Sequence, residues 1–240
     1  MRIPHMRIPR PPAPSLSLAA VCAAVLLAAS ALPATATSAS APAPREGTVG
    51  AAELLAKVTS CTRISQGEYR TDEEAPATVP VCGTDGAVFW KADMDIDCDG
   101  QRTTRCNENT DPWFQPDTAF HQSDGRPLRS DSLPYVVVPS VSETWSFPSA
   151  GIGGGGVVAV IHDGKVQYAV VGDTGPKRII GEASYATAEA LGIDPDPATG
   201  GTDAEVTYIL FPHSRVSPIE NHDAAVTLGD RLAREFVRGD

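Results

Sequence analysis

Four aspartates alternate along one short segment, at positions 93, 95, 97 and 99. In an extended strand alternate side chains share a face, so Asp93, Asp95 and Asp97 are expected to project together while Met94 and Ile96 point into the core. Neighbours on that face are roughly 6–7 Å apart, close enough to repel one another. The row therefore predicts a cation, a shared proton or a positively charged ligand beside it.

Calcium is one alternative for this row. The pattern from Asp95 to Gly100 (DIDCDG) matches the first half of a calcium-binding loop, but the twelfth position is Cys106 and not the required Glu. We therefore predict no metal site. A calcium site of another kind, or acids that only cap turns and bind water, remain open.

A second acidic pattern consists of Asp173, in GDTGP, and Glu182, nine residues later in IGEAS. Hydrolysis of a glycosidic bond needs two such groups, one protonated to assist the leaving oxygen and one ionised to activate water or attack the sugar. Small and apolar neighbours would desolvate Glu182 and raise its pKa, while Asp173 lies in a more polar, turn-like setting. Two acids near turns are commonplace, so their spacing alone does not identify a site.

Other chemistries have weaker support. The four-glycine run 153–156 lacks the Lys and the strand–loop–helix context of a phosphate loop, and there is no G-x-S-x-G pattern. The five histidines are scattered, and no cysteine or histidine pair has zinc-ligand spacing. Aromatic side chains could stack on sugar faces, although at least two of these four are expected in the core: Trp90, Trp113, Trp145 and Tyr185.

These residues are positioned by elements that are mostly strands. Segments rich in β-branched and aromatic residues predict strands at 87–93, 135–139, 157–162, 166–171 and 206–211. Asp163-Gly164 is a hairpin turn between two of them. Helical spacing predicts helices at 49–60, 185–191 and 223–237, the second with Ser184 as N-cap and Gly192 beyond its end. Many short strands joined by loops indicate a mainly β fold, a small closed barrel with a few peripheral helices.

The chain begins with a predicted secretory signal peptide, residues 1–36. Three arginines precede an apolar stretch, and the small-x-small pattern Ala34-Thr35-Ala36 follows it. A membrane anchor is disfavoured because the stretch is short and contains serines. The repeat MRIPH-MRIPR leaves the true start at Met1 or Met6 open. Residues 37–46 are a predicted flexible linker, and 47–240 a single catalytic domain.

The chain is acidic, with a formal net charge of −11. Removing the leader removes three arginines and no acid, which takes the charge to −14. Such a charge argues against nucleic acid as a partner and suits a polycationic substrate. Solubility alone would explain it as well.

Five cysteines are present, of which Cys22 lies in the leader. The remaining four imply two disulfides in an exported chain. Three pairings are possible, and we favour Cys61–Cys82 with Cys98–Cys106.

From 87 to 220 the chain resembles the fungal-type chitosanases, glycoside hydrolase family 75. The matching stretches are FWKADMDIDCDG, TDPWFQ, LPYVVVP, VVAVIHDGKVQYAVVGDTGP, IGEASYATAEALGI and VTYILFP. The resemblance implies that Asp173 and Glu182 are the essential acids. It also implies internal hydrolysis of chitosan by an inverting route, which requires carboxyls roughly 6.5–9.5 Å apart.

A second resemblance concerns the fold. The segment VVGDTGPKRIIGEASYATAEALGI is similar to the core of double-psi β-barrels of the rare-lipoprotein-A group, a barrel shared with family 45 endoglucanases and expansins. It implies a double-psi-like barrel with Glu182 as general acid. It also makes Asp95 or Asp97 a competitor of Asp173 as base. The lipoprotein group has Asp where this chain has Glu182, whose longer side chain moves the carboxyl outward.

Together these observations predict a secreted, monomeric endo-chitosanase without a cofactor or membrane partner. Glu182 is the expected general acid and Asp173 the expected general base. The residues expected to bind substrate are Asp93, Asp95, Asp97, Thr174 and Tyr185. The alternatives are a non-hydrolytic, expansin-like polysaccharide-binding barrel and a peptidoglycan-cleaving enzyme of the lipoprotein-A type.

Overall fold

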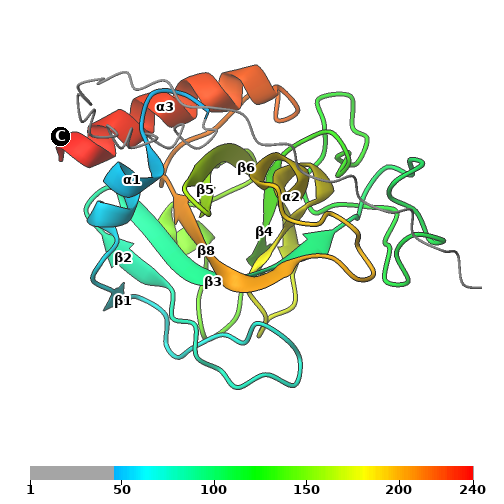
Figure 1. The fold of residues 1–240 in the computed structure, drawn as a ribbon, viewed down its shortest axis with the longest axis horizontal. Helices are drawn as coiled ribbons and strands as arrows, with labels where there is room; N and C mark the ends of the chain where they lie inside the picture. The colour runs from blue at the N-terminus through cyan, green and yellow to red at the C-terminus, as the bar shows by residue number, and fades with distance from the viewer. Residues whose placement is uncertain (1–45, 240) are drawn as a thin grey trace, which may run out of the picture. The chain divides into compact units, whose positions relative to one another are not determined.

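Six strands pair in a complete circle and close a barrel (Figure 1). The computed structural model describes residues 46–239, and the order around the barrel is β3–β7–β4–β6–β5–β8, with β8 pairing again with β3. Each of these strands therefore has hydrogen-bonded neighbours on both sides, which fixes its register.

The barrel strands differ in length, and two of them are much longer than the sequence predicts. The six are β3 (Ala87–Asp97), β4 (Tyr135–Pro139), β5 (Val157–His162), β6 (Lys165–Gly175), β7 (Glu182–Ser184) and β8 (Thr202–Leu210). Two further strands, β1 (Thr62–Arg63) and β2 (Cys82–Thr84), extend the sheet outward from the start of β3.

Alternation along the strands divides the apolar residues into two clusters. The cluster inside the barrel contains alternate residues of its strands, among them Trp90, Met94, Val171 and Ala183. The residues between them belong to a second cluster on the outer face, under the first and the last helix, whereas Ala188 and Leu191 of the middle helix pack with the first cluster. The barrel interior is thus a packed core, and a site must lie on its outer face or at its ends.

Three α-helices surround the barrel: α1 (Ala51–Lys57), α2 (Tyr185–Leu191) and α3 (His222–Arg238). A short 3₁₀ helix, η1 (Pro148–Ala150), precedes β5. Helix α3 packs Ala225, Ala233 and Phe236 into the outer cluster, beside α1. The Ser184 hydroxyl caps α2 by accepting the Thr187 N–H at 3.3 Å, and α2 ends at a left-handed glycine, as predicted.

The predicted fold class, mainly β with a small closed barrel and a few helices, is confirmed. The double-psi character of the connections stays a prediction. The sequence did not predict β1, β2 or β7. These strands have two or three residues each, which is too short for an alternation pattern to be recognised.

Both predicted disulfides are present, Cys61–Cys82 and Cys98–Cys106. The first ties the segment after α1 to β2. The second closes the loop that leaves the end of β3, directly after Asp97. The acids at that strand end are therefore linked covalently to the loop that follows them.

The predicted leader and most of the predicted linker lie outside the described residues. Glu46, the last residue of that linker, contacts the barrel: its N–H donates to the Val166 carbonyl at 3.1 Å, and its carboxylate accepts the Tyr168 N–H at 2.9 Å. Across positions 46–239, no helix has the length and apolarity needed to cross a membrane.

Candidate active site

The two acids singled out in the sequence lie on strands that flank β4. Asp173 on β6 and Glu182 on β7 are both register partners of Val137, one on each side of it. Two interstrand spacings separate their Cα atoms by about 10 Å. A side-chain Cβ built at Gly175, two residues beyond Asp173, would lie 3.1 Å from Glu182 Oε2, so the glutamate extends toward the end of β6.

A β-bulge turns Asp173 toward Glu182. Along β6, Val171 points into the barrel, and simple alternation would point Asp173 there too. The register with β4 shifts between Val136, which pairs with Val171, and Val137, which pairs with Asp173. The additional residue, Gly172, reverses the alternation. Asp173 therefore shares the outer face with Val137 and Glu182, as bulges near functional sites commonly arrange.

The aspartate row extends this arrangement onto a fourth strand. Asp95 on β3 is the parallel register partner of Glu182. Met94 is fully buried in the interior cluster, as predicted, so the odd-numbered acids of β3 lie on the outer face. One ladder row thus crosses β3, β7, β4 and β6 and carries Asp95, Glu182, Val137 and Asp173.

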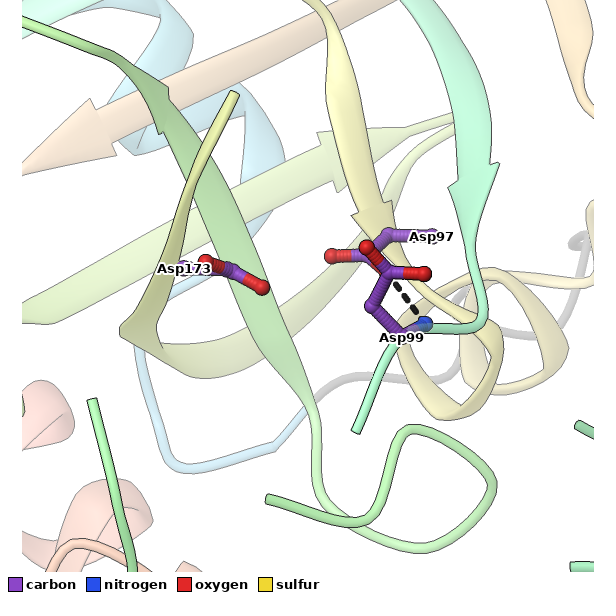
Figure 2. Close-up of side chains that lie close together, drawn as sticks. All are labelled: Asp97, Asp99 and Asp173. Atoms are coloured by element: carbon purple, nitrogen blue, oxygen red, sulfur yellow. Dashed lines mark hydrogen bonds between the residues drawn. The ribbon is translucent and has the colours of Figure 1, made fainter. Parts of the chain in front are cut away.

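Three aspartates meet at one end of this row. Asp97, Asp99 and Asp173 each have a carboxylate oxygen within 4.8 Å of the others (Figure 2). Asp97 is the last residue of β3 and Asp99 follows it by two residues; in Figure 2 the Asp97 carboxyl group faces Asp173 on β6, and the Asp99 carboxyl group lies beside that of Asp97. The Asp99 N–H donates to Asp97 Oδ1 at 2.6 Å, which holds the turn after the strand.

Asp173 is buried but accepts hydrogen bonds from the backbone. Its Oδ1 accepts the Ala119 N–H at 2.8 Å and the Thr174 N–H at 2.6 Å. Burial raises the pKa of Asp173, and these two hydrogen bonds oppose the increase because they favour the charged form. Asp99 has one comparable bond, from the Gln115 N–H at 2.6 Å, and burial raises its pKa to about 7.

Glu182 and Asp97 are in a setting that favours the protonated form. Burial, followed by repulsion from Asp95 and Asp99, raises the pKa of Glu182 to about 8. Asp97 is 5% exposed, and burial, then repulsion from Glu182, raises its pKa well above the ordinary value. Burial, followed by repulsion from Asp72 and Asp203, raises the pKa of Asp95 to about 6. The cluster therefore contains both a proton donor and carboxyls that can ionise.

Glu182 opens into a cavity of about 460 Å³ with an acidic lining. Its carboxyl-bearing residues are Asp72, Asp95, Asp97, Asp99, Asp111 and Glu182, and no basic side chain of the described residues lines it. Trp113, Pro197 and Ala198 contribute apolar surface. A low-dielectric pocket of one charge sign attracts ligands of the opposite sign.

The predicted aspartate row is divided between two cavities. Asp95 and Asp97 line the cavity beside Glu182, whereas Asp93 lines a neighbouring one of about 380 Å³ with Asp203 and Glu205. Asp72 lines both cavities, so the two adjoin. Most charged side chains of both linings are acidic, and the second lining also contains Lys91, which pairs with Glu205 at 3.2 Å. We call the two adjoining cavities the acidic groove.

Asp93 has an unusual environment in its cavity. Its Oδ1 is buried without a hydrogen-bond partner, and burial, then repulsion from Asp95, raises its pKa to about 7. A Cβ at Gly181 would approach that oxygen to 2.2 Å, and Gly181 has a φ of +111°. Only glycine satisfies both conditions, so the residue before Glu182 must be glycine for Asp93 to occupy this position.

The two remaining predicted site residues have other contacts. The Thr174 N–H binds the Asp173 carboxylate. The Tyr185 ring packs under the Arg105 guanidinium at 5.3 Å, and Tyr185 is not among the residues that line either acidic cavity. Of the aromatic candidates, Trp90 and Trp145 are in the core at 1% and 6% exposure, and Trp113 is 81% exposed.

Sequence reasoning did not assign a role to four residues of the site. Asp72 and Ala119 come from loops without a periodic pattern, so no sequence signal placed them near Glu182. Asp111 lies in TDPWFQ, one of the stretches that resemble the chitosanases, but that resemblance gave it no role. Asp99 had a signal, because it is the fourth of the alternating aspartates, but only the first three were expected to bind substrate. The spacing of the Asp97, Asp99 and Asp173 oxygens would also admit a cation.

Comparison with known proteins identifies the family of the chain. Residues 94–236 match the family model described as fungal chitosanase of glycosyl hydrolase group 75. The matched region includes Asp95, Asp97, Asp99, Asp173 and Glu182, and it covers more than half of the chain.

Similar curated proteins come from two Aspergillus species. Endo-chitosanase B of Aspergillus oryzae is 33% identical over 179 residues, covering 63% of this chain and 74% of that protein. Endo-chitosanase C of the same species is 31% identical over 169 residues, covering 65% of this chain but only 42% of that protein. An endo-chitosanase of Aspergillus fumigatus is 31% identical over 143 residues, covering 54% of this chain and 60% of that protein. The chain belongs to the fungal chitosanase family, glycosyl hydrolase group 75.

Proposed function

We propose that this protein is a secreted endo-chitosanase that hydrolyses β-1,4 linkages between glucosamine units with inversion. Glu182 is the general acid and Asp173 the general base. The observation that carries the proposal is their common register with Val137, which presents both carboxyls on one face of the barrel. The names of the similar proteins support chitosan as the substrate.

Glu182 suits the acid role because it retains its proton. With a pKa raised to about 8, chiefly by burial, it is protonated at neutral and acidic pH. A general acid must carry that proton when the glycosidic oxygen leaves. Repulsion from Asp173 also raises the pKa of Glu182, so ionisation of the base helps to keep the acid protonated.

Asp173 suits the base role because two backbone N–H groups stabilise its charge. Asp97, the buried member of the row, has one such bond and a pKa raised further by Glu182. Asp95 remains the stronger alternative base, because it is more exposed and is the register partner of Glu182.

The strand separation supports the inverting route. Inverting enzymes need carboxyls roughly 6.5–9.5 Å apart so that a water fits beside the sugar, while retaining enzymes need about 5–5.5 Å. Asp173 and Glu182 are two strands apart, with Cα atoms about 10 Å from one another, and side chains on one face at that spacing can hold their carboxyls in the wider range. Asp95 is one strand from Glu182, with Cα atoms about 5 Å apart, and that pair suits the closer range.

The acidic groove suits a polymer with regularly spaced ammonium groups. Asp93, Asp95 and Asp97 would bind these groups, and the positive charge would also lower their raised pKa values. An N-acetylated unit brings no charge and leaves the buried carboxyls unpaired, so selection for glucosamine follows. Thr174 would contribute by holding Asp173, and Tyr185 by the position of its ring at the start of α2.

Secretion is part of the proposal, supported by the two disulfides, which persist in oxidising compartments. No cofactor takes part in the proposed reaction. The acid–base pair and the acidic groove are sufficient for it.

The test is a comparison of three polymers: chitosan of low acetylation, chitin, and purified peptidoglycan sacculi. We expect new reducing ends from chitosan, with viscosity falling before short oligomers accumulate, and little release from the other two. Release from sacculi but not chitosan would replace the proposal with the lipoprotein-A type activity. Binding to chitosan without any new reducing ends would favour the expansin-like barrel.

A further inference from the structure

The exposed indole of Trp113 is exceptional in this chain. Its side chain is 81% exposed, whereas Trp90 and Trp145 are 1% and 6% exposed in the core. Among the described residues the other exposed large apolar side chains are Val141 at 48% and Ile64 at 37%. An exposed indole forgoes the stabilising free energy that burial of a large apolar side chain would provide. The exposure of Trp113 therefore indicates a surface that contacts a ligand or partner.

Trp113 lies at the proposed active site. It lines the cavity of about 460 Å³ that also contains Glu182, Asp95 and Asp99. The indole is therefore within the same pocket as the proposed general acid and not on a remote surface.

The backbone around Trp113 is firmly held although the side chain is uncovered. Its N–H donates to Asp111 Oδ1 at 2.8 Å, and its carbonyl accepts from Gln115 Nε2 at 3.0 Å. The Gln115 N–H in turn binds Asp99 Oδ1 at 2.6 Å. The next residue, Phe114, is buried with its ring under the Arg102 guanidinium at 5.3 Å. The backbone that carries the Trp113 indole is thus fixed before any ligand binds, and Gln115 links it to the end of the aspartate row.

We propose that Trp113 is a stacking platform for one glucosamine ring of the polymer, and so a determinant of substrate binding; this inference rests on the proposed function. The flat apolar face of a hexose matches an exposed indole, and a protonated amine near the ring adds a cation–π attraction. The acidic lining of the same cavity complements that amine. Carboxylates alone would bind any polyamine, whereas the indole selects for a sugar ring.

The first test measures binding without turnover. In the Glu182→Gln variant, Trp113 is the one tryptophan of three that is accessible to acrylamide quenching. Saturation with a glucosamine hexamer is expected to remove most of the acrylamide quenching. In the double variant Glu182→Gln/Trp113→Phe the hexamer is expected to have no such effect. Calorimetry on the same samples reports whether the hexamer binds at all.

The outcomes separate the two proposals. Hexamer binding with unchanged quenching of Trp113 would overturn the platform and leave the chitosanase proposal intact. No hexamer binding to Glu182→Gln, together with no turnover by the unmodified protein, would overturn the chitosanase proposal itself. Protection from quenching by the hexamer but not by spermine supports the sugar-ring selection, and equal protection by spermine would contradict it.

The second test is kinetic. Trp113→Ala is expected to raise KM for chitosan by roughly threefold to tenfold with kcat within about twofold, because stacking is lost equally from substrate and transition state. Trp113→Tyr should restore most of the affinity. Val141→Ala removes another exposed apolar side chain and serves as the matched control, with unchanged KM. An unchanged KM for Trp113→Ala, or a fall in kcat that Trp113→Tyr does not rescue, would overturn the platform.

Discussion

Asp173 and Glu182 are both register partners of Val137, one on each side of β4. Their separation is therefore set by the hydrogen-bonded ladders of a closed barrel and not by the loops around them. Neither carboxyl forms an ion pair with a basic side chain among residues 46–239 in the salt bridges of this structure. Replacing either by its amide removes charge without removing a structural contact that closes the barrel.

Amide substitution of each acid should abolish turnover while retaining the fold. Glu182→Gln and Asp173→Asn are each expected to reduce kcat on chitosan by about 10²- to 10⁴-fold, the usual contribution of general acid–base groups. Initial rates and thermal unfolding measure the two effects. Glu189→Gln is the matched control: it removes an exposed carboxylate that pairs with Arg105 at 3.0 Å and should leave kcat nearly unchanged. Near-normal turnover by either amide variant would remove that residue from the mechanism.

The first product of hydrolysis should carry the α-configuration at its new reducing end. Asp173 and Glu182 are on strands separated by β4, about two interstrand distances apart, and this separation leaves room for a water on the face opposite the leaving group. Proton NMR of the anomeric region during the first minutes, before mutarotation, measures this directly. A β-product would indicate the closer pair, Asp95 with Glu182, and a covalent intermediate.

A methyl group at Gly172 should disturb the bulge that directs Asp173. A Cβ there would lie 2.6 Å from Tyr135 Cβ and 2.8 Å from Leu128 Cδ1. We expect Gly172→Ala to lower the free energy of unfolding by about 1–3 kcal/mol, as overpacking does, and to lower kcat as well. Gly153→Ala is the control, because a Cβ at Gly153 meets nothing within 4 Å. Denaturant unfolding and initial rates on the same preparations would show whether stability and activity fall together.

This bulge also marks a limit of prediction from the sequence. The sequence predicted strand β6 as far as Val171. On β3 it predicted that Met94 faces the core and that the alternate aspartates face away from it. Alternation alone, continued past Gly172, points Asp173 into the barrel. The reversal depends on the register with β4, which is a property of two strands 35 residues apart and has no local signal.

The loop contributions were unreadable for a related reason. Asp72 and Asp111 reach the cavity because the segments that carry them fold over the outer face, held by long-range contacts such as the Arg70 N–H to the Arg178 carbonyl at 2.9 Å. No periodicity constrains such segments. The cysteine pairing was left open among three possibilities by the sequence, and the structure contains the favoured one, Cys61–Cys82 with Cys98–Cys106.

The stability of the free protein should fall as pH rises from about 4 to about 8. The pKa of Glu182 is raised from 4.5 to about 8, and that of Asp99 from 3.8 to about 7, both chiefly by burial. In that window the unfolded chain has lost protons that the folded chain retains, so folding becomes less favourable as pH increases. Thermal unfolding between pH 5 and pH 8 measures the slope.

Two comparisons make the pH prediction specific. Glu182→Gln should flatten the slope and raise the midpoint at pH 8, because the amide has no proton to lose. A glucosamine oligomer should raise the midpoint more at pH 6 than an equal concentration of N-acetylated oligomer, since only the amine offsets the clustered carboxylates. A midpoint that increases with pH in this range would contradict the burial of Glu182.

The two disulfides should differ in their effect on activity. Cys98–Cys106 begins one residue after Asp97 and closes the loop leading to Asp111 and Trp113. Its double serine variant is expected to lose activity on chitosan more strongly than the Cys61–Cys82 double variant, which alters a strand at the edge of the sheet. Turnover measured well below the unfolding midpoint of each variant separates this effect from stability. Equal residual activities would show that the loop keeps its position without the bond.

The N–H of Ala119 is one of the two groups that favour the charged form of Asp173, and it comes from a segment 54 residues earlier in the chain. That segment is itself held by Thr118, whose hydroxyl donates to the Phe120 carbonyl at 2.7 Å and accepts the Leu128 N–H at 3.0 Å. A substitution at Thr118 that displaces the Ala119 N–H would therefore raise the pKa of Asp173 and shift the pH range of activity, without altering any carboxyl group. A natural or engineered variant adapted to a less acidic medium need not show its adaptation in the groove at all.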